Sequence, residues 1–269
     1  MGLWQKPPRG ALINPSHPLA RGLDACWVFN ESAGTQISDS VSRTTATFAS
    51  VGTAPIWAPG GVRVFGDGSQ ISIPRRPSLE GIANISVRVI FERIGAQDAY
   101  SGLLCYALTG NPYNMFALRL DDVGDNVRGE ISTAARVVTL GTSTIADSVI
   151  YDAVMVYNGA TITLYCNGKL DNTPEAQTGN LGFGAASYKQ FDFGVAGTTD
   201  GLNNLNGNIY HGAIWSRALS ADEVGWLYRE PYAMFQRRVP VRYFYLPTSG
   251  ETLLINVHDC GSDRPVIFD

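Results

Sequence analysis

Residues 206–230 constrain the fold of this 269-residue chain more than any other segment. A strand-like run ends in a turn, and Ser220 and Glu223 then stand three residues apart, which is the spacing of a helical capping box. In such a box the Ser220 hydroxyl accepts a hydrogen bond from the Glu223 N–H, and the Glu223 carboxylate accepts one from the Ser220 N–H. The segment therefore predicts a β-strand followed by one short helix over residues 221–229, which ends before Pro231.

Two Asn-Gly pairs predict β-hairpins in the middle of the chain. Asn158-Gly159 and Asn167-Gly168 each follow a β-rich run, and Asn-Gly favours the type I′ turn, which matches the twist of the strands it joins. We therefore expect a three-stranded meander over residues 152–170. Three apolar side chains are expected on one face of its middle strand: Ile162, Leu164 and Cys166.

Alternating apolar and polar residues predict further strands. Residues 85–92 alternate in this way and place Arg88 on the polar face, and residues 116–121 repeat the pattern. A Gly-Asp-Gly turn predicts a hairpin between strands at 62–65 and 71–73. Roughly a dozen short strands with a single helix predict an all-β fold, a two-sheet antiparallel jelly-roll sandwich.

The two ends of the chain differ in amino-acid composition from its middle. Residues 1–20 contain four prolines, so we expect an extended N-terminal arm before a sandwich domain at 21–230. Residues 231–269 are predicted to form a C-terminal extension with one or two strands, used as an interaction arm. Its contact residues are expected to be Arg237, Arg238, Arg242, Tyr243 and Phe244. The arms can dock on neighbouring subunits or fold back on their own domain, and both alternatives stay open.

Composition excludes some classes of function. A net charge of −4 argues against general binding to nucleic acid or to an anionic membrane. No run of 18 apolar residues is present, so no membrane-spanning helix is expected. The first ten residues lack the apolar core of a secretory signal peptide. We therefore expect a protein that is made in a cytoplasm and leaves it, if at all, by lysis or within a particle.

The four cysteines are widely spaced and form no Cys-x-x-Cys pair, which argues against a zinc site or a thioredoxin-like motif. Cys26 and Cys166 stand in apolar runs, where buried free thiols are common. One or two disulfides among the four cysteines, which also include Cys105 and Cys260, stay an open alternative.

Four segments, in order along the chain, resemble those of one known family. They are Trp27–Glu31 with Gly34 and Asp39, Gly61–Gly68 with Ile71–Pro74, Ala153–Gly168, and residues 206–230. Together they resemble the concanavalin A-like, laminin G-like jelly-roll domains over about residues 20–230. The opening of the chain, Lys6–Pro8 followed by Asn14–Leu23, is similar to laminin G-like proteins encoded by tailed bacteriophages.

This resemblance implies a function as well as a fold. With no signal peptide in the sequence, the main prediction is a non-catalytic structural protein of a bacteriophage virion, most readily a capsid decoration or cement subunit, or a component of a fibre or tail. Its expected partners are the major capsid protein or other virion proteins, and its own copies in a homo-oligomer such as a trimer. Its expected location is the virion.

The alternative prediction is a lectin-like module that binds host or mucosal glycans. Such binding uses aromatic rings together with a few polar groups on loops or on a sheet face. Four aromatic residues in or near predicted loops are candidates for stacking on a sugar ring: Trp57, Tyr100, Tyr106 and Tyr113.

A glycoside hydrolase or polysaccharide lyase is the least favoured alternative. Glycosidases need two carboxylates that flank the scissile bond, and the superfamily signature Glu-x-Asp-x-x-Glu is absent from this sequence. The acidic cluster at residues 121–125 has the composition of a turn. We therefore predict no catalytic residue and no enzyme.

The resemblance also implies a possible structural calcium ion near the opening loop, for which Asp39 is the candidate ligand. Calcium prefers six to eight oxygen ligands. The family's last strand often carries Asp-Glu at positions where this chain has Tyr210 and His211, and histidine is a poor ligand for calcium. The alternative for Asp39 is an Asx turn in its loop. No other cofactor is expected.

Overall fold

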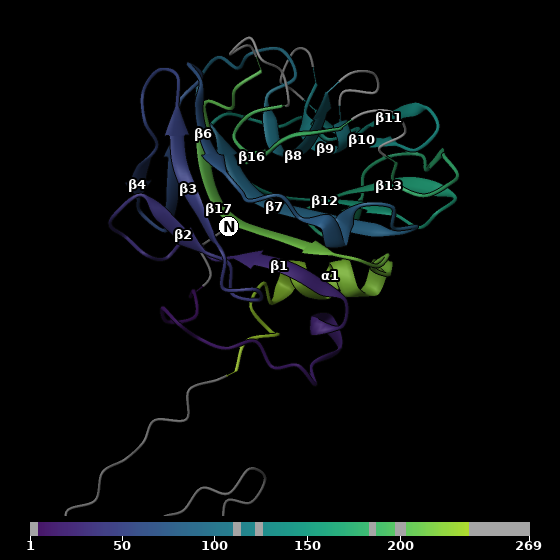
Figure 1. The fold of residues 1–269 in the computed structure, drawn as a ribbon, viewed down its shortest axis with the longest axis horizontal. Helices are drawn as coiled ribbons and strands as arrows, with labels where there is room; N and C mark the ends of the chain where they lie inside the picture. The colour runs from purple at the N-terminus through teal and green to yellow at the C-terminus, as the bar shows by residue number, and fades with distance from the viewer. Residues whose placement is uncertain (1–4, 110–113, 122–125, 183–186, 197–202, 237–269) are drawn as a thin grey trace, which may run out of the picture. The chain divides into compact units, whose positions relative to one another are not determined.

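Two antiparallel β-sheets stacked face to face make up most of the described protein (Figure 1). The computed structural model describes residues 5–109, 114–121, 126–182, 187–196 and 203–236. The nine-stranded sheet contains β1 (Leu23–Trp27), β4 (Ile56–Ala58), β5 (Gly61–Val64), β7 (Ile85–Arg93), β12 (Ile150–Tyr157), β13 (Thr161–Cys166), β14 (Lys169–Leu170), β15 (Glu175–Ala176) and β17 (Gly207–Trp215). The eight-stranded sheet contains β2 (Gln36–Ser38), β3 (Thr45–Ser50), β6 (Ser69–Ser72), β8 (Gly102–Thr109), β9 (Asn114–Leu120), β10 (Val127–Ser132), β11 (Arg136–Leu140) and β16 (Ser187–Phe193).

The order of the strands combines hairpin neighbours, such as β12 with β13, and pairings between distant segments, such as β7 with β17. The nine-stranded sheet runs β14-β13-β12-β7-β17-β5-β4, with β1 paired to β17 and β15 paired to β13. The eight-stranded sheet runs β11-β10-β9-β8-β16-β6-β3-β2. Helix α1 (Ala221–Arg229) and short 3₁₀ turns at Pro18–Ala20 and Pro77–Leu79 complete the described elements. The predicted all-β, two-sheet antiparallel sandwich with one short helix is confirmed.

Aromatic rings from both sheets fill the main core between them. Trp27 and Phe29 each meet the ring of Phe193 edge to face, with centroids 5.2 Å apart in both cases. Tyr106 stacks on Phe191 with a centroid distance of 4.9 Å. These side chains are almost fully buried, and burial of such large apolar surfaces is the main favourable term in folding.

The predicted hairpin between strands 62–65 and 71–73 is wrong. The structure assigns β5 to the nine-stranded sheet, where it pairs with β17 and β4, and assigns β6 to the eight-stranded sheet, where it pairs with β3 and β16. The chain therefore crosses from one sheet to the other at the Gly-Asp-Gly segment. A turn signal marks a change of direction, but it carries no information about which strands then pair.

The two Asn-Gly pairs form different turns. Asn167 and Gly168 both have positive φ, 51° and 75°, which confirms the predicted type I′ turn. At the earlier pair only Gly159 has positive φ. There the Asn158 side chain accepts hydrogen bonds from the two N–H groups of Ala160 and Thr161, at 3.0 and 2.8 Å, so the turn is closed by the side chain instead.

The capping box of helix α1 forms as predicted. The Glu223 N–H donates to the Ser220 hydroxyl at 3.2 Å, and the Ser220 N–H donates to the Glu223 carboxylate at 2.9 Å. Arg217 pairs with the same carboxylate at 2.6 Å. The box therefore starts the helix on local chemistry alone.

Helix α1 lies on the outer side of the nine-stranded sheet (Figure 1). A second apolar cluster joins this face of the sheet to α1, to residues 11–20 and to residues 232–235. Val154 and Trp215 contribute from the sheet, Leu227 from the helix, and Leu19 from the N-terminal segment. The indole N–H of Trp215 donates to the Leu19 carbonyl at 2.7 Å. Both faces of this sheet are therefore covered.

The N-terminal arm folds back on its own domain over residues 5–20, which is one of the two alternatives that the sequence left open. The Asn14 N–H donates to the Met234 carbonyl and the Gln236 N–H donates to the Leu12 carbonyl, both at 2.8 Å. Residues 231–236 consequently pack with the sandwich, although the predicted C-terminal extension was to start at residue 231. The remaining interaction candidates lie outside the described residues: Arg237, Arg238, Arg242, Tyr243 and Phe244.

Arg88, placed by its pattern on a polar face, is fully buried under helix α1. Its guanidinium forms two hydrogen bonds with the Asp152 carboxylate, at 2.9 and 2.6 Å, and donates to the Leu227 carbonyl at 3.0 Å. The strand alternates as predicted, but the face opposite the main core is covered, so its charge is neutralised inside the protein.

Three of the four cysteines are described, and each is a buried free thiol: Cys26, Cys105 and Cys166. This confirms the prediction for Cys26 and Cys166. Burial raises the pKa of all three thiols, so they are protonated at neutral pH. Among the described residues, no helix has the length and apolar character needed to cross a membrane.

Candidate functional site

Charged side chains gather on the outer face of the eight-stranded sheet, at one end of its strand order. Strands β9, β10 and β11 are neighbours, and their only charged residues are Arg119, Arg128, Glu130 and Arg136. Arg119 pairs in register with Arg128. The residues that alternate with them, such as Leu118, belong to the main core. The four charges therefore share the face that points away from the core.

Glu130 is the centre of this cluster and is fully buried. Its carboxylate accepts hydrogen bonds from Arg119 Nη2 at 2.5 Å and from Asn114 Nδ2 at 3.1 Å. Arg136 approaches the same carboxylate at 3.5 Å. The Arg128 side chain makes no hydrogen bond to the described residues, and its guanidinium lies over an aromatic ring instead.

That ring belongs to Tyr100, one of the four aromatic residues singled out from the sequence. The guanidinium carbons of Arg119 and Arg128 lie 5.0 and 4.8 Å from its centroid. Tyr100 has a φ of 60°, a left-handed backbone conformation that is unfavourable for a residue with a side chain. Such strain persists where the surrounding structure holds the residue in one position, and it is frequent at binding sites.

The other aromatic candidates lie elsewhere. Tyr106 is in the main core and donates to the Glu80 carboxylate at 2.6 Å. Trp57 packs on Phe48 and donates its indole N–H to the Gly34 carbonyl at 2.8 Å. Tyr113 is outside the described residues. Of the four, Tyr100 is therefore the one that the structure brings together with a polar cluster.

Sequence reasoning missed Arg128, Glu130 and Arg136. The signal was present, because Val127, Gly129 and Ile131 alternate with polar residues in the same way as the neighbouring predicted strand. The pairing of two such polar faces depends on the register between β9 and β10, which the sequence does not state.

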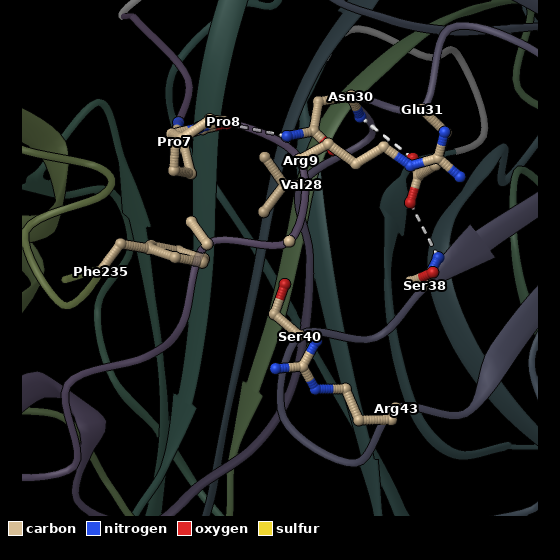
Figure 2. A pocket seen from close by; sticks show the side chains of 12 residues that line it. Pro7, Pro8, Arg9, Val28, Asn30, Glu31, Ser38, Ser40, Arg43 and Phe235 are labelled. Atoms are coloured by element: carbon tan, nitrogen blue, oxygen red, sulfur yellow. Dashed lines mark hydrogen bonds between the residues drawn. The ribbon is translucent and has the colours of Figure 1, made fainter. Parts of the chain in front are cut away.

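A small pocket lies between the N-terminal segment and the opening loop (Figure 2). Arg9 and Arg43 border it, and the Glu31 carboxylate accepts hydrogen bonds from the N–H groups of Asn30 and Ser38 at 3.1 and 2.9 Å. Its volume of about 120 Å³ is below the range of roughly 300–1,000 Å³ that is common for ligand pockets. It is therefore too small to enclose a sugar ring.

A larger hollow of about 770 Å³ lies at the rim of the nine-stranded sheet. Tyr151 and Tyr228 contribute rings to its lining, and Lys169 contributes a charge. The Tyr151 hydroxyl is engaged with the backbone, since it accepts from the Ala146 N–H at 3.0 Å. This hollow is the alternative location that a binding experiment must separate from the arginine cluster.

Asp39, the calcium candidate, is fully buried and already paired with a protein cation. Its carboxylate forms an ion pair with Arg76 and accepts hydrogen bonds from the N–H groups of Cys26 and Val41 at 2.8 and 2.9 Å. The bond from Val41 is that of an Asx turn. Arg76 also pairs with Asp24 at 3.0 Å. Because a guanidinium occupies the cationic position beside Asp39, the residues there do not fit a calcium ion.

A second protein cation lies at the last strand. The Lys6 ammonium donates to the backbone carbonyls of Val28, Phe29 and Tyr210. Burial lowers the pKa of Lys6 to about 7. Three donated hydrogen bonds act in the opposite direction, because only the protonated amine has three N–H groups. Among the described residues, no cluster of three or more His, Cys, Asp or Glu side chains could hold a metal ion.

His211 follows in the same strand and is fully buried, with its Nε2 3.6 Å from the Cys26 sulfur. Its ring lies 5.5 Å from that of Tyr232. Burial, and then the charges of Arg88 and Lys6, hold the pKa of His211 well below its usual value of about 6.5. His211 is therefore neutral at pH 7.

The free energy of unfolding is expected to fall on acidification through His211. Below about pH 6.5 the unfolded chain binds a proton at this residue and the folded chain does not, so stability falls by up to about 1.4 kcal/mol per pH unit. The variant His211→Gln should lack this part of the slope. Urea unfolding between about pH 7.5 and 5.5 measures both proteins, and equal slopes in the two would contradict the assignment.

The sequence of residues 65–225, which is 161 of the 269 residues, matches the family model of the concanavalin A-like lectin/glucanase superfamily. The chain belongs to this superfamily. A comparison with curated protein sequences found no match.

Solved structures that share the fold include sialidases and a domain of an arabinanase. A Trypanosoma rangeli sialidase matches with a TM-score of 0.59 and 16% identity over 81% of this chain and 36% of the sialidase. Domain 4 of AbnA, a GH43 extracellular arabinanase from Geobacillus stearothermophilus in complex with arabinotriose, matches with a TM-score of 0.60 and 17% identity over 76% of this chain and 97% of that domain. The CBM40 of a Ruminococcus gnavus sialidase, bound to α2,3-sialyllactose, matches with a TM-score of 0.52 and 14% identity over 63% of this chain and 96% of the CBM40.

These neighbours correct two predictions made from the sequence. The main prediction, a structural protein of a bacteriophage virion, is contradicted, since the solved structures that match include sialidases, an arabinanase domain and a CBM40. The prediction that the chain is not an enzyme is contradicted by the same glycoside hydrolases. The findings favour the alternative prediction of carbohydrate binding. At these identities the likeness shows the fold, and the chain spans about a third of the length of the sialidase.

Proposed function

We propose that this chain is a carbohydrate-binding module, which binds a glycan on the outer face of the eight-stranded sheet. The observation that carries the proposal is the juxtaposition of the Tyr100 ring with Arg119 and Arg128 on a sheet face that points away from the core. Sugar sites combine an aromatic surface with a few well-positioned polar groups.

The chemistry of the cluster suits a pyranose or furanose ring. The half-exposed Tyr100 can pack against the C–H face of a sugar, while Arg128 and Arg136 can donate hydrogen bonds to hydroxyl oxygens. The buried Glu130 accepts hydrogen bonds from Arg119 and Asn114, so these two side chains are held in position before a ligand binds. Two neighbours of the same fold support the proposal, because they were solved with arabinotriose and with sialyllactose.

The proposal predicts that Tyr100→Ala lowers glycan affinity about tenfold, because the stacking surface is removed. The test is a glycan array on the wild-type chain, followed by calorimetric titration of the best ligand with each variant. Tyr228→Ala serves as the comparison, since this tyrosine lines the large hollow at the other sheet. Thermal unfolding of each variant checks that the fold is intact.

Loss of affinity in Tyr228→Ala with normal binding by Tyr100→Ala would move the site to the hollow. Absence of binding to every glycan on the array, neutral or charged, would contradict the function itself.

A further inference from the structure

The charge on strands β9, β10 and β11 is unbalanced, while the same face of the sheet also carries the buried Asp192 of β16. Strands β9, β10 and β11 together carry three arginines and one carboxylate, that of Glu130, whose oxygens already contact Arg119, Arg136 and Asn114. Arg128 has no carboxylate partner among the described residues. On a chain with a net charge of −4, this is a local excess of positive charge.

Two guanidinium groups on neighbouring strands approach the same ring. Arg119 and Arg128 stand opposite each other in the register of β9 and β10, and both approach the ring of Tyr100. Like charges at such a position repel each other. Burial, followed by the neighbouring charge of Arg119, lowers the pKa of Arg128 from its usual value. A negatively charged group bound between the two arginines would relieve this repulsion.

Donor groups on both arginines are also unused. The Nε atoms of Arg119 and Arg128 are buried and have no hydrogen-bond partner among the described residues. A buried donor without a partner is unfavourable, and native proteins rarely keep one without a ligand, an ion or water to satisfy it. A guanidinium presents its donors as a planar fork that matches the two oxygens of a carboxylate or a sulfate.

We propose that the glycan bound by this module carries a carboxylate or sulfate group, which Arg119 and Arg128 hold beside the ring of Tyr100. The inference rests on the proposed carbohydrate-binding function and names its ligand class, an acidic sugar. Arg128 supplies a guanidinium that has no carboxylate partner among the described residues. Arg119, which bonds Glu130, supplies the second positive charge. The tyrosine ring packs against the sugar that bears the acidic group.

The experiment compares acidic glycans with neutral forms of the same backbone. The probes are trigalacturonate beside its methyl ester, and dextran sulfate beside dextran, each titrated calorimetrically into the full chain. We expect at least one acidic probe to bind about tenfold or more tightly than its neutral form, because charge-assisted hydrogen bonds are lost in the neutral one. Raising the salt concentration should weaken binding of the acidic probe and leave the neutral probe unaffected.

Variants assign the preference to the arginine fork. Arg128→Gln should abolish the preference for the acidic probe, and Arg128→Lys should retain only part of it, because lysine keeps the charge without the fork. Arg43→Gln is the matched control, since Arg43 is an exposed arginine at the small pocket of Figure 2. It should bind like the wild type.

The failures of the inference and of the function are distinguishable. Equal binding of acidic and neutral probes, or an unchanged preference in Arg128→Gln, overturns the acidic ligand while carbohydrate binding stands. Binding to no probe and to no glycan on the array overturns both. An effect of Arg43→Gln in place of Arg128→Gln overturns the assignment to this face.

Discussion

Replacing Arg88 with methionine is expected to lower the free energy of unfolding by about 3–5 kcal/mol. The change removes the partner of Asp152, which is almost fully buried under helix α1, and leaves its carboxylate without compensation. It also removes the donor to the Leu227 carbonyl in the last turns of the helix. The midpoint and slope of a urea unfolding curve measure the loss.

A double variant separates the cost of a broken ion pair from the value of the pair itself. In Arg88→Met/Asp152→Leu both charges are removed, so the stability should recover in large part relative to the single variant. Recovery should be incomplete, because the Leu227 carbonyl still lacks its donor. A single variant that loses less than about 1 kcal/mol would show that water reaches Asp152 and that the pair is not sealed by the helix.

The second large effect is expected at Arg76, the cation beside Asp39. The variant Arg76→Met should lose about 3–5 kcal/mol, because Asp39 is fully buried and keeps its charge with no cation to pair with it. The adjacent residue is the matched control, since Arg75 pairs with Glu80 at the surface. Arg75→Met should change stability far less, because solvent already screens that pair.

A stabilising effect of calcium on the wild-type protein would contradict this second prediction. If Asp39 bound calcium, the thermal midpoint of the wild type would rise on addition of calcium chloride and fall with a chelator. Such a response would contradict the assignment of Arg76 as the cation of this cluster.

Local chemistry explains why some elements could be predicted. The capping box of Ser220 and Glu223 and the type I′ turn at Asn167-Gly168 depend on residues within four positions of each other, and both form as expected. The alternating patterns of β7 and β13 correctly separate the core face from the other face. These signals were enough to predict a two-sheet sandwich.

Three features could not be predicted for one physical reason. Each depends on contacts with segments that are distant in the sequence, and a short stretch of residues does not show which distant segment it will contact. Strands β5 and β6 are close in sequence but belong to different sheets, because their partners β17 and β16 come from more than a hundred residues away. Arg88 was expected on a polar face, yet helix α1 and residues 11–20 and 232–235 cover that face. For Asp39 the sequence left a calcium ligand and an Asx turn as alternatives, and it did not show that Arg76 reaches this carboxylate from 37 residues away.

The candidate site was likewise predictable from the sequence only in part. The sequence by itself determined that Tyr100 is an aromatic residue near a loop and that the strand around Arg119 has a polar face, because these are properties of short segments. Only the tertiary structure decided that Arg119 and Arg128 both approach the ring of Tyr100 while the buried Glu130 bonds Arg119. Register and sheet order set these distances, and they depend on the total burial that the whole sandwich achieves.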